Sequence, residues 1–313
     1  MGNKITIIGA GQVGSTIAFA LTLKELASEI VLIDINNERA MGEAMDIRQG
    51  TPFIGAVSIH NGDYQDAKDS DIVIVTSGVA RKPGQSRLEL AQTNVDITKT
   101  IIPQITKYAP DAKYVIVANP VDILTYQFVK TAGLPANHVM GTGTLLDTAR
   151  FRECIAEKYK VGQENVHGYV LGEHGDSSFV PWSLANIASV PVTKFSEALR
   201  EKKVEEINKD EVEDYIRKSG GIIIAAKKCT NYGIGVTSSQ VCEALKYENE
   251  SVMTISSLID GEYGISDVCL SVPLILNRKG IISHIEAPLT DDELEKLRHS
   301  AECLKNVIKQ IKF

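Results

Sequence analysis

Apolar and polar positions along the first half of the chain alternate between short β-branched runs and longer amphipathic stretches. The short runs predict strands over residues 5–8, 30–33, 72–76, 114–118 and 139–141. These runs lack a polar face and are separated by helical stretches, which is typical of parallel strands covered by helices on both sides. The pattern therefore predicts an α/β fold with a doubly wound parallel sheet.

The pattern changes near residue 145, where longer helical stretches mix with runs that predict strands over residues 166–171, 187–192, 253–258 and 268–275. A long amphipathic helix is expected after Thr290, because Thr290 and Glu293 form a capping-box pattern. No linker rich in Pro, Gly or Ser separates the halves. We therefore expect two abutting units, residues 1–144 and an α+β portion over residues 145–313, with a site in the crevice between them.

Composition excludes several classes of protein. With 313 residues, 43% of them hydrophobic, and a net charge of -7, nucleic-acid binding is disfavoured. No apolar run of about 18 residues predicts a membrane span, and the first residues already read as a strand rather than a leader. The cysteines are five, scattered and without a C-x-x-C pair. They fit reduced thiols in the cytoplasm rather than disulfides or a metal site.

A glycine-rich turn lies between the first predicted strand and an apolar helix over residues 17–23. Its G-x-G-x-x-G spacing lets the backbone approach a pyrophosphate at the N-terminus of a helix, as in a Rossmann-type fold. Asp34 follows the second strand, where an acid can bind a ribose 2′-hydroxyl and repel a 2′-phosphate. The turn therefore predicts NAD rather than NADP, with contacts from Gly9, Gly11, Gln12, Val13 and Gly14.

His174 lies among small residues just after the apolar run 169–171. A histidine titrates near neutrality, so it can donate a proton in a reduction and accept one in an oxidation. Asp147 is the expected partner that orients its ring, and Arg150 offers a planar fork to a substrate carboxylate. A spacing of three places Asp147 and Arg150 on one helix face. An Asp-Arg salt bridge alone would explain that pair but not His174.

The segment 77–87 follows a strand and carries three cations, two glycines and a proline. We expect a flexible loop over residues 78–93 that closes over the crevice and brings Arg87 to polarise a substrate carbonyl. A solvated run of charges is the alternative. Asn119 follows another strand and could bind the substrate or the nicotinamide, while Gly78 is placed with the cofactor.

Together these residues closely resemble the NAD-dependent L-lactate/malate dehydrogenase family over nearly the whole chain. The matching motifs span residues 9–14, 119–126, 146–152 and 172–176. The resemblance implies that His174 and Asp147 form the proton-relay pair, Arg150 binds the substrate C1 carboxylate and Arg87 polarises the carbonyl. It also implies that Asn119 and Thr230 line the site, and that the chain forms a homo-oligomer, a dimer or more often a tetramer.

Features of both branches of the family are present. The lactate branch is favoured by the run 122–126 and by Glu173, Trp182 and Thr230. Arg81 lies where lactate enzymes usually carry Gln and malate enzymes carry Arg, and Gln85 replaces a frequent Glu. Arg81 could pair with the second carboxylate of oxaloacetate.

We therefore predict a bacterial-type L-lactate dehydrogenase of glycolysis and fermentation that interconverts pyruvate and L-lactate. The alternative is a malate dehydrogenase that acts on oxaloacetate and L-malate. A non-catalytic NAD-binding protein would be expected to lack His174, Asp147, Arg87 or Arg150, and all four are present. Arg152 and His167 also match positions where allosteric relatives bind fructose 1,6-bisphosphate, although both could serve only as hydrogen-bonding residues of a subunit interface.

Overall fold

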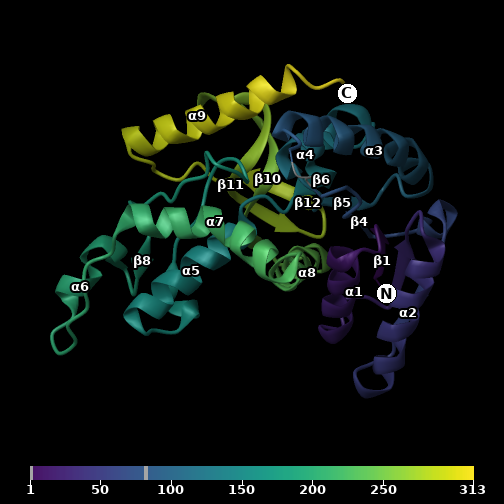
Figure 1. Cartoon of the computed structure of the whole chain (residues 1–313), viewed down its shortest axis with the longest axis horizontal. Coiled ribbons are helices and arrows are strands. Elements are labelled where there is room, and N and C mark those ends of the chain that lie inside the picture. Colours follow the sequence, from purple (N-terminus) through teal and green to yellow (C-terminus); the bar gives the residue numbers. More distant parts are fainter. Residues whose placement is uncertain (1–2, 81–83) are drawn as a thin grey trace.

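The computed structural model describes residues 3–80 and 84–313, and a nine-stranded sheet forms its centre (Figure 1). Six parallel strands make up one part of that sheet, in the order β6-β5-β4-β1-β2-β3. They are β1 Lys4–Ile8, β2 Glu29–Ile33, β3 Ser58–Asn61, β4 Ile72–Val75, β5 Lys113–Ile116 and β6 Val139–Gly141. The doubly wound parallel sheet is confirmed, and β3 is an additional strand that the apolar pattern did not predict. The strand order reverses between β1 and β4, which creates a ligand-binding crevice at the carboxyl ends of the strands.

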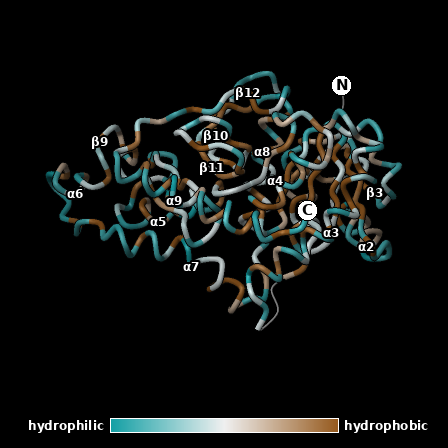
Figure 2. The backbone as a smooth tube through the Cα atoms, turned by 90° about the horizontal axis from the view of Figure 1, so that it is seen from above, coloured by the Kyte–Doolittle hydropathy of each residue, from teal (hydrophilic) through white to brown (hydrophobic). Residues whose placement is uncertain are grey.

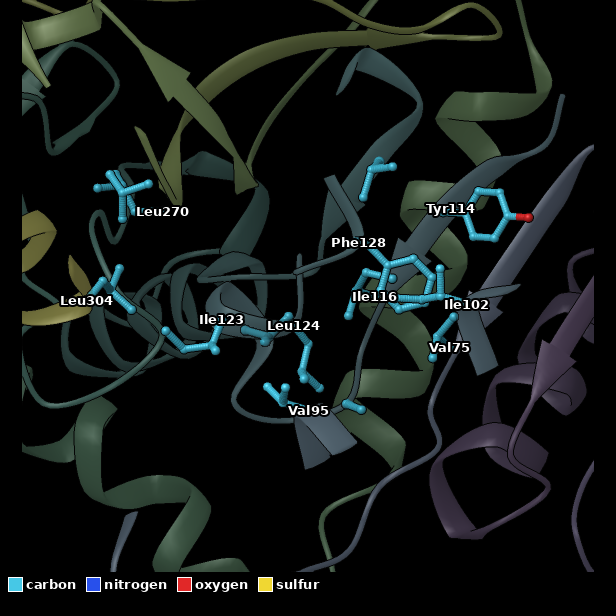
Figure 3. Close-up of a cluster of buried hydrophobic side chains, with 14 of the residues drawn as sticks. Val75, Val95, Ile102, Tyr114, Ile116, Ile123, Leu124, Phe128, Leu270 and Leu304 are labelled. Atoms are coloured by element: carbon cyan, nitrogen blue, oxygen red, sulfur yellow. The ribbon is translucent and has the colours of Figure 1, made fainter. Parts of the chain in front are cut away.

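Helices cover both faces of this sheet because its strands are buried on both sides. Alternate residues of each strand enter different clusters: Ile5 and Ile7 pack toward α1 (Gln12–Leu23), whereas Ile8 packs with α3 (Arg87–Tyr108) and α4 (Val121–Thr131). α2 spans Asn37–Gly50 and contacts α1. Figure 3 shows the cluster that contains Ile8, in which Phe128 of α4 and Leu304 join the side chains of the parallel strands.

The strands of the second half extend the same sheet instead of forming a separate one. β10 (Ser251–Asp260), β11 (Ser266–Asn277) and β12 (Gly280–His284) run antiparallel, and β10 joins β6 through the pair Ser256 and Gly141. A second, three-stranded sheet is formed by β7 (Val166–His167), β8 (Asn186–Ile187) and β9 (Val190–Pro191). The strands predicted over 166–171 and 187–192 are therefore much shorter than expected.

Five helices pack around these strands: α5 (Leu145–Tyr159), α6 (Phe195–Ala198), α7 (Lys209–Lys227), α8 (Tyr232–Lys246) and α9 (Asp291–Ile308). The predicted capping box begins α9, where Thr290 accepts from the amide of Glu293 and the Glu293 carboxylate accepts from Thr290. α9 crosses one side of the molecule above β10 and β11 (Figure 1). In Figure 2 apolar segments gather on the interior strands and polar ones on the periphery. Within the described ranges, no helix is both long and apolar enough to span a membrane.

Candidate active site

A cavity of about 570 Å³ lies where the parallel strands end, between the two halves of the chain. Its wall combines residues after β1, β4 and β5 with residues of α5, α7 and α8 and of the segment 173–178. Ligands of doubly wound folds bind at this edge. The cavity is large enough to receive a small organic acid beside a nicotinamide ring. Half of the residues that the sequence singled out line it: Val13, Gly78, Arg87, Asn119, Asp147, Arg150, His174 and Thr230.

His174, Asp147 and Arg150 form one hydrogen-bonded group on the cavity wall. Asp147 lies in the first turn of α5 and is only 4% exposed. Its Oδ2 lies 2.6 Å from Nδ1 of His174, and its Oδ1 accepts from Nη1 of Arg150 at 2.8 Å. The expected shared helix face of Asp147 and Arg150 is confirmed. One carboxylate thus makes the salt bridge and also binds the histidine, so the two interpretations of the pair are not exclusive.

The charges of this group favour a protonated histidine. The negative charge of Asp147 raises the pKa of His174 from its ordinary 6.5 to about 9, against the opposing effect of burial. Burial alone would raise the pKa of Asp147, but the charges and hydrogen bonds of His174 and Arg150 lower it. With Nδ1 bonded to Asp147, no described residue bonds Nε2, which is therefore available to a substrate oxygen.

Arg87 lies in a helix rather than in a loop. It is the first residue of α3, and the side chain of Ser86 caps that helix by accepting from the amide of Glu89. The flexible loop predicted over 78–93 is therefore wrong for 87–93, because the capping box of Ser86 and Glu89 starts the helix earlier than the glycine and proline suggested. Arg87 pairs with Asp176 at 2.6 Å and is 63% exposed. Arg81 lies outside the described residues.

Asn94 of α3 ties together two segments that line the cavity. Its side-chain oxygen accepts from the amide of Val79 at 2.8 Å, and its amide nitrogen donates to the carbonyl of Asn119 at 2.7 Å. Gly78 lies against the same side chain. Asn119 precedes a cis peptide bond to Pro120. Asn94 thus holds the predicted Gly78 and Asn119 at the edge of the cavity.

The glycine-rich turn has the geometry that a dinucleotide requires. A Cβ on Gly14 would lie 1.9 Å from the carbonyl oxygen of Gly9, whereas a Cβ on Gly11 would meet nothing within 4 Å. Gly14 thus permits close packing of turn and helix, while Gly11 leaves the start of α1 open to a pyrophosphate. Exposed Gln12 begins α1. Asp34 follows β2, and its carboxylate is held by the amides of Ala10 at 2.7 Å and Asn36 at 2.9 Å.

Several polar residues that line the cavity received no role from the sequence, among them Asn94, Asp122 and Asp176. Asp122 accepts from the backbone amide of His174 at 2.8 Å, and Asp176 pairs with Arg87. Asp176 lies two residues after His174, so its proximity to the site could have been anticipated. Asn94 lies in a helix that faces the site only in the folded chain, and nothing in its local pattern distinguishes it. Asp122 lies within the motif 119–126, which marked this segment but gave the side chain no role.

Arg152 and His167 lie away from the cavity. Arg152 belongs to α5 and His167 to β7, two elements that are in contact. His167 is exposed, and Nε of Arg152 is buried without a hydrogen-bond partner among the described residues. Neither residue lines the cavity that contains His174.

Both halves of the chain match models of one protein family. Residues 3–141 match the NAD binding domain of lactate/malate dehydrogenases, and residues 144–313 match the alpha/beta C-terminal domain of the same enzymes. The chain belongs to the lactate/malate dehydrogenase family. The resemblance seen in the sequence is thereby confirmed, together with the Rossmann-type NAD-binding fold.

Members of the lactate/malate dehydrogenase family resemble this chain along its full length. It is 44% identical to an L-lactate dehydrogenase of Acetivibrio thermocellus over 98% of this chain and 97% of that one. It is also 44% identical to L-lactate dehydrogenase 1 of Clostridium acetobutylicum, over 98% of each chain. A ligand-bound crystal structure of the minor L-lactate dehydrogenase from Enterococcus mundtii superposes with a TM-score of 0.95 at 38% identity, covering 100% of this chain and 99% of that one.

Proposed function

We propose that this protein is an NAD-dependent L-lactate dehydrogenase that interconverts pyruvate and L-lactate. The observation that carries the proposal is the group of His174, Asp147 and Arg150 on the wall of a cavity that Val13 of the glycine-rich turn also lines. The similarity to bacterial L-lactate dehydrogenases supports the lactate branch. We assign cofactor binding to residues 1–144 and most of the substrate site to residues 145–313.

The residues of the site divide the work of the reaction. NAD, when bound, accepts or supplies the hydride. Nε2 of His174 gives a proton to the carbonyl oxygen of pyruvate in reduction and takes it from the hydroxyl of lactate in oxidation. Asp147 holds the ring by Nδ1 and stabilises its protonated form. Arg150 binds the substrate carboxylate through its free guanidinium donors, and Arg87 polarises the carbonyl.

Arg81 supports oxaloacetate as a second candidate substrate. If the segment around Arg81 encloses the substrate, pyruvate leaves this cation without a partner, whereas oxaloacetate offers a second carboxylate. The similarity of this chain to L-lactate dehydrogenases favours pyruvate as the substrate instead. Asn119 and Thr230 line the cavity, and we assign them to substrate positioning.

The test is NADH oxidation with pyruvate and with oxaloacetate as alternative substrates. We expect a larger kcat/KM for pyruvate, and we expect Arg81→Gln to widen the preference; an unchanged ratio would mean that Arg81 does not read the substrate. His174→Ala should lower turnover about a hundredfold while NADH binding persists. Oxidation of NADH with neither acid would contradict the proposal.

We further propose that copies of this chain assemble, most simply as a tetramer. Exposed apolar side chains cover neighbouring helices: Phe19 and Leu23 of α1, Met41 and Met45 of α2, Ile222 and Ile224 of α7, and Val236 of α8. α1 packs against both α2 and α8, and we call the exposed apolar side chains of these three helices, together with those of α7, the apolar helical face. Patches of this kind mark interaction surfaces, and a second copy of the chain is the partner we propose.

Regulation and cellular role are part of the same proposal. We assign Arg152 and His167 to a fructose 1,6-bisphosphate site at a subunit interface, because a buried guanidinium nitrogen without a partner and an exposed imidazole offer donors to a phosphate. Simple interface hydrogen bonding is the competing role. Pyruvate reduction would regenerate NAD in the cytoplasm during glycolysis and fermentation.

A further inference from the structure

Asp122 is the one deeply buried carboxylate of the described site that the proposed reaction leaves unused. It lies in the first turn of α4, and only 3% of the residue is exposed. Its Oδ2 accepts from the backbone N–H of His174 at 2.8 Å, whereas its Oδ1 is buried without a hydrogen-bond partner among the described residues. A buried carboxylate that is only half satisfied destabilises the fold, so a contribution elsewhere has to explain its presence.

The segment that carries His174 depends on side chains from other elements. β7 ends at His167, and beyond it the chain makes only isolated bridges at Leu171 and Gly172. Asp122 of α4 bonds the amide of residue 174. Ser300 of α9 accepts from the amide of Glu173 at 2.7 Å, and Arg217 of α7 donates to the carbonyl of Ser178 at 3.1 Å. Of these three, Asp122 is the one that bonds His174 itself.

Asp122 also acts on the imidazole through its charge. The groups that face His174 are Asp147 and Arg150 of α5 together with Asp122, and Asp122 adds to the larger effect of Asp147 in raising the pKa of the ring. Burial raises the pKa of Asp122 itself to about 6, opposed by the nearby Ser256 and then by the amide and charge of His174, so that its carboxyl is largely ionised at neutral pH. Glu173 and Cys269 are the other titratable groups close to it.

We propose that Asp122 is a positioning residue for His174, which fixes the backbone of residue 174 and adds a second negative charge to that of Asp147. The inference rests on the proposed function in taking His174 as the proton donor. A neutral amide at position 122 would keep an acceptor for the backbone N–H but remove the charge. An alanine would remove both. The two substitutions therefore separate the two parts of the role.

The experiment compares Asp122→Asn and Asp122→Ala in the full-length protein. We expect Asp122→Asn to lower the pKa of His174 by about half a unit or more, read both from NMR of the histidine ring and from the high-pH limb of pyruvate reduction. Asp122→Ala should in addition lower kcat about tenfold or more, because the ring loses its fixed position, while the Kd of NADH stays unchanged.

Asp267→Asn is the matched control. It makes the same change beside the same helix, where Asp267 pairs with Tyr126 and Lys130 of α4. In the described part of the chain, Asp267 makes no hydrogen bond or ion pair with the segment 172–178. A His174 titration identical in wild type and Asp122→Asn, with turnover of Asp122→Ala equal to that of Asp267→Asn, would overturn the proposal. If Asp122→Ala does not fold, the His174 titration of Asp122→Asn alone tests the proposal. NMR needs no substrate, so this result is independent of whether the wild type reduces pyruvate.

Discussion

At the scale of single residues, the ion pair of Asp147 and His174 determines when the site can give or take a proton. A pKa of about 9 keeps His174 protonated at neutral pH in the free protein. That state is the proton donor for pyruvate reduction, and lactate oxidation needs the neutral ring. The site is therefore prepared for reduction at physiological pH.

This preparation predicts opposite pH profiles for the two directions. The kcat/KM for pyruvate should be flat through neutrality and fall as the pH rises through about 9, whereas kcat/KM for lactate should rise over the same range. Asp147→Asn removes the main cause of the raised pKa, so the falling limb should move to lower pH. Initial rates in both directions measure this, with NADH fluorescence as the control for cofactor binding. A limb that stays in place would contradict the assigned pair.

The raised pKa of His174 also links pH to folding stability. A group whose pKa is higher in the folded than in the unfolded chain stabilises the fold fully below its unfolded value, near 6.5. That contribution is lost as the pH rises through the folded value of about 9. Loss of the His174 proton therefore removes the proton donor and also lowers the stability of the hydrogen-bonded group of His174, Asp147 and Arg150.

Sequence reasoning found the residues that act on the substrate more readily than those that hold them. His174, Asp147 and Arg150 could be predicted because their chemistry is specific and because Asp147 and Arg150 are only three residues apart. Asp122 lies 52 residues before His174 and meets it only through the packing of α4. A buried acid at the start of a helix is indistinguishable in sequence from an ordinary first-turn acid that favours the helix dipole.

At the scale of elements, the start of α3 connects a helix cap to the substrate site. Ser86 caps α3, and Arg87 is the first helical residue and pairs with Asp176. A side chain on the first turn takes its direction from the backbone of that turn. Ser86 therefore sets the direction in which the Arg87 guanidinium points.

Ser86→Ala should lower the stability of this helix end by ~1 kcal/mol, because the amide of Glu89 loses its acceptor. Hydrogen exchange at the first turn of α3 would measure the loss. We also expect a lower kcat/KM for pyruvate. Thr290→Ala removes the equivalent cap of α9, far along the chain from Arg87, and should cost similar stability without that kinetic effect. Equal kinetics in both variants would show that the cap does not orient Arg87.

Elements were predicted well where a local sequence signal was specific and poorly where contacts with other elements determined the structure. The parallel strands and the start of α9 could be recognised, because β-branched runs and a capping box are strong local signals. The run 166–171 looked like a strand, yet only Val166 and His167 pair as one. Beyond them, the amide of Val170 donates to Thr148 of α5, and Leu171 makes an isolated bridge to Phe179. Contacts with other elements therefore determined the conformation of that segment.

At the scale of the whole molecule, the apolar helical face predicts self-association. A Met45→Glu variant should sediment as smaller species than the wild type, because Met45 is 48% exposed and would place a charge within the proposed interface. Val252→Glu is the control, since Val252 of β10 is 52% exposed outside that face. Sedimentation velocity measures both. A wild type that sediments as a monomer at assay concentrations would contradict the proposed assembly.

Measurements of the reaction rate test the proposed effector. Fructose 1,6-bisphosphate should increase the rate of pyruvate reduction at low pyruvate. The increase should be lost in His167→Ala, which removes one hydrogen-bond donor to the phosphate of the effector. Rates that do not change with effector at several pyruvate concentrations would leave Arg152 and His167 as interface residues only.

The single junction between β6 and β10 constrains how the molecule can move. Because Ser256 pairs with Gly141, the strands beneath the cofactor and the strands behind the substrate belong to one hydrogen-bonded sheet. A Cβ at Gly141 would lie 2.3 Å from Oγ1 of Thr125, so helix α4 is pressed directly onto this junction. Two lobes that swing apart would have to break the sheet between β10 and β6. A hinge motion that separates the two sets of strands is therefore disfavoured.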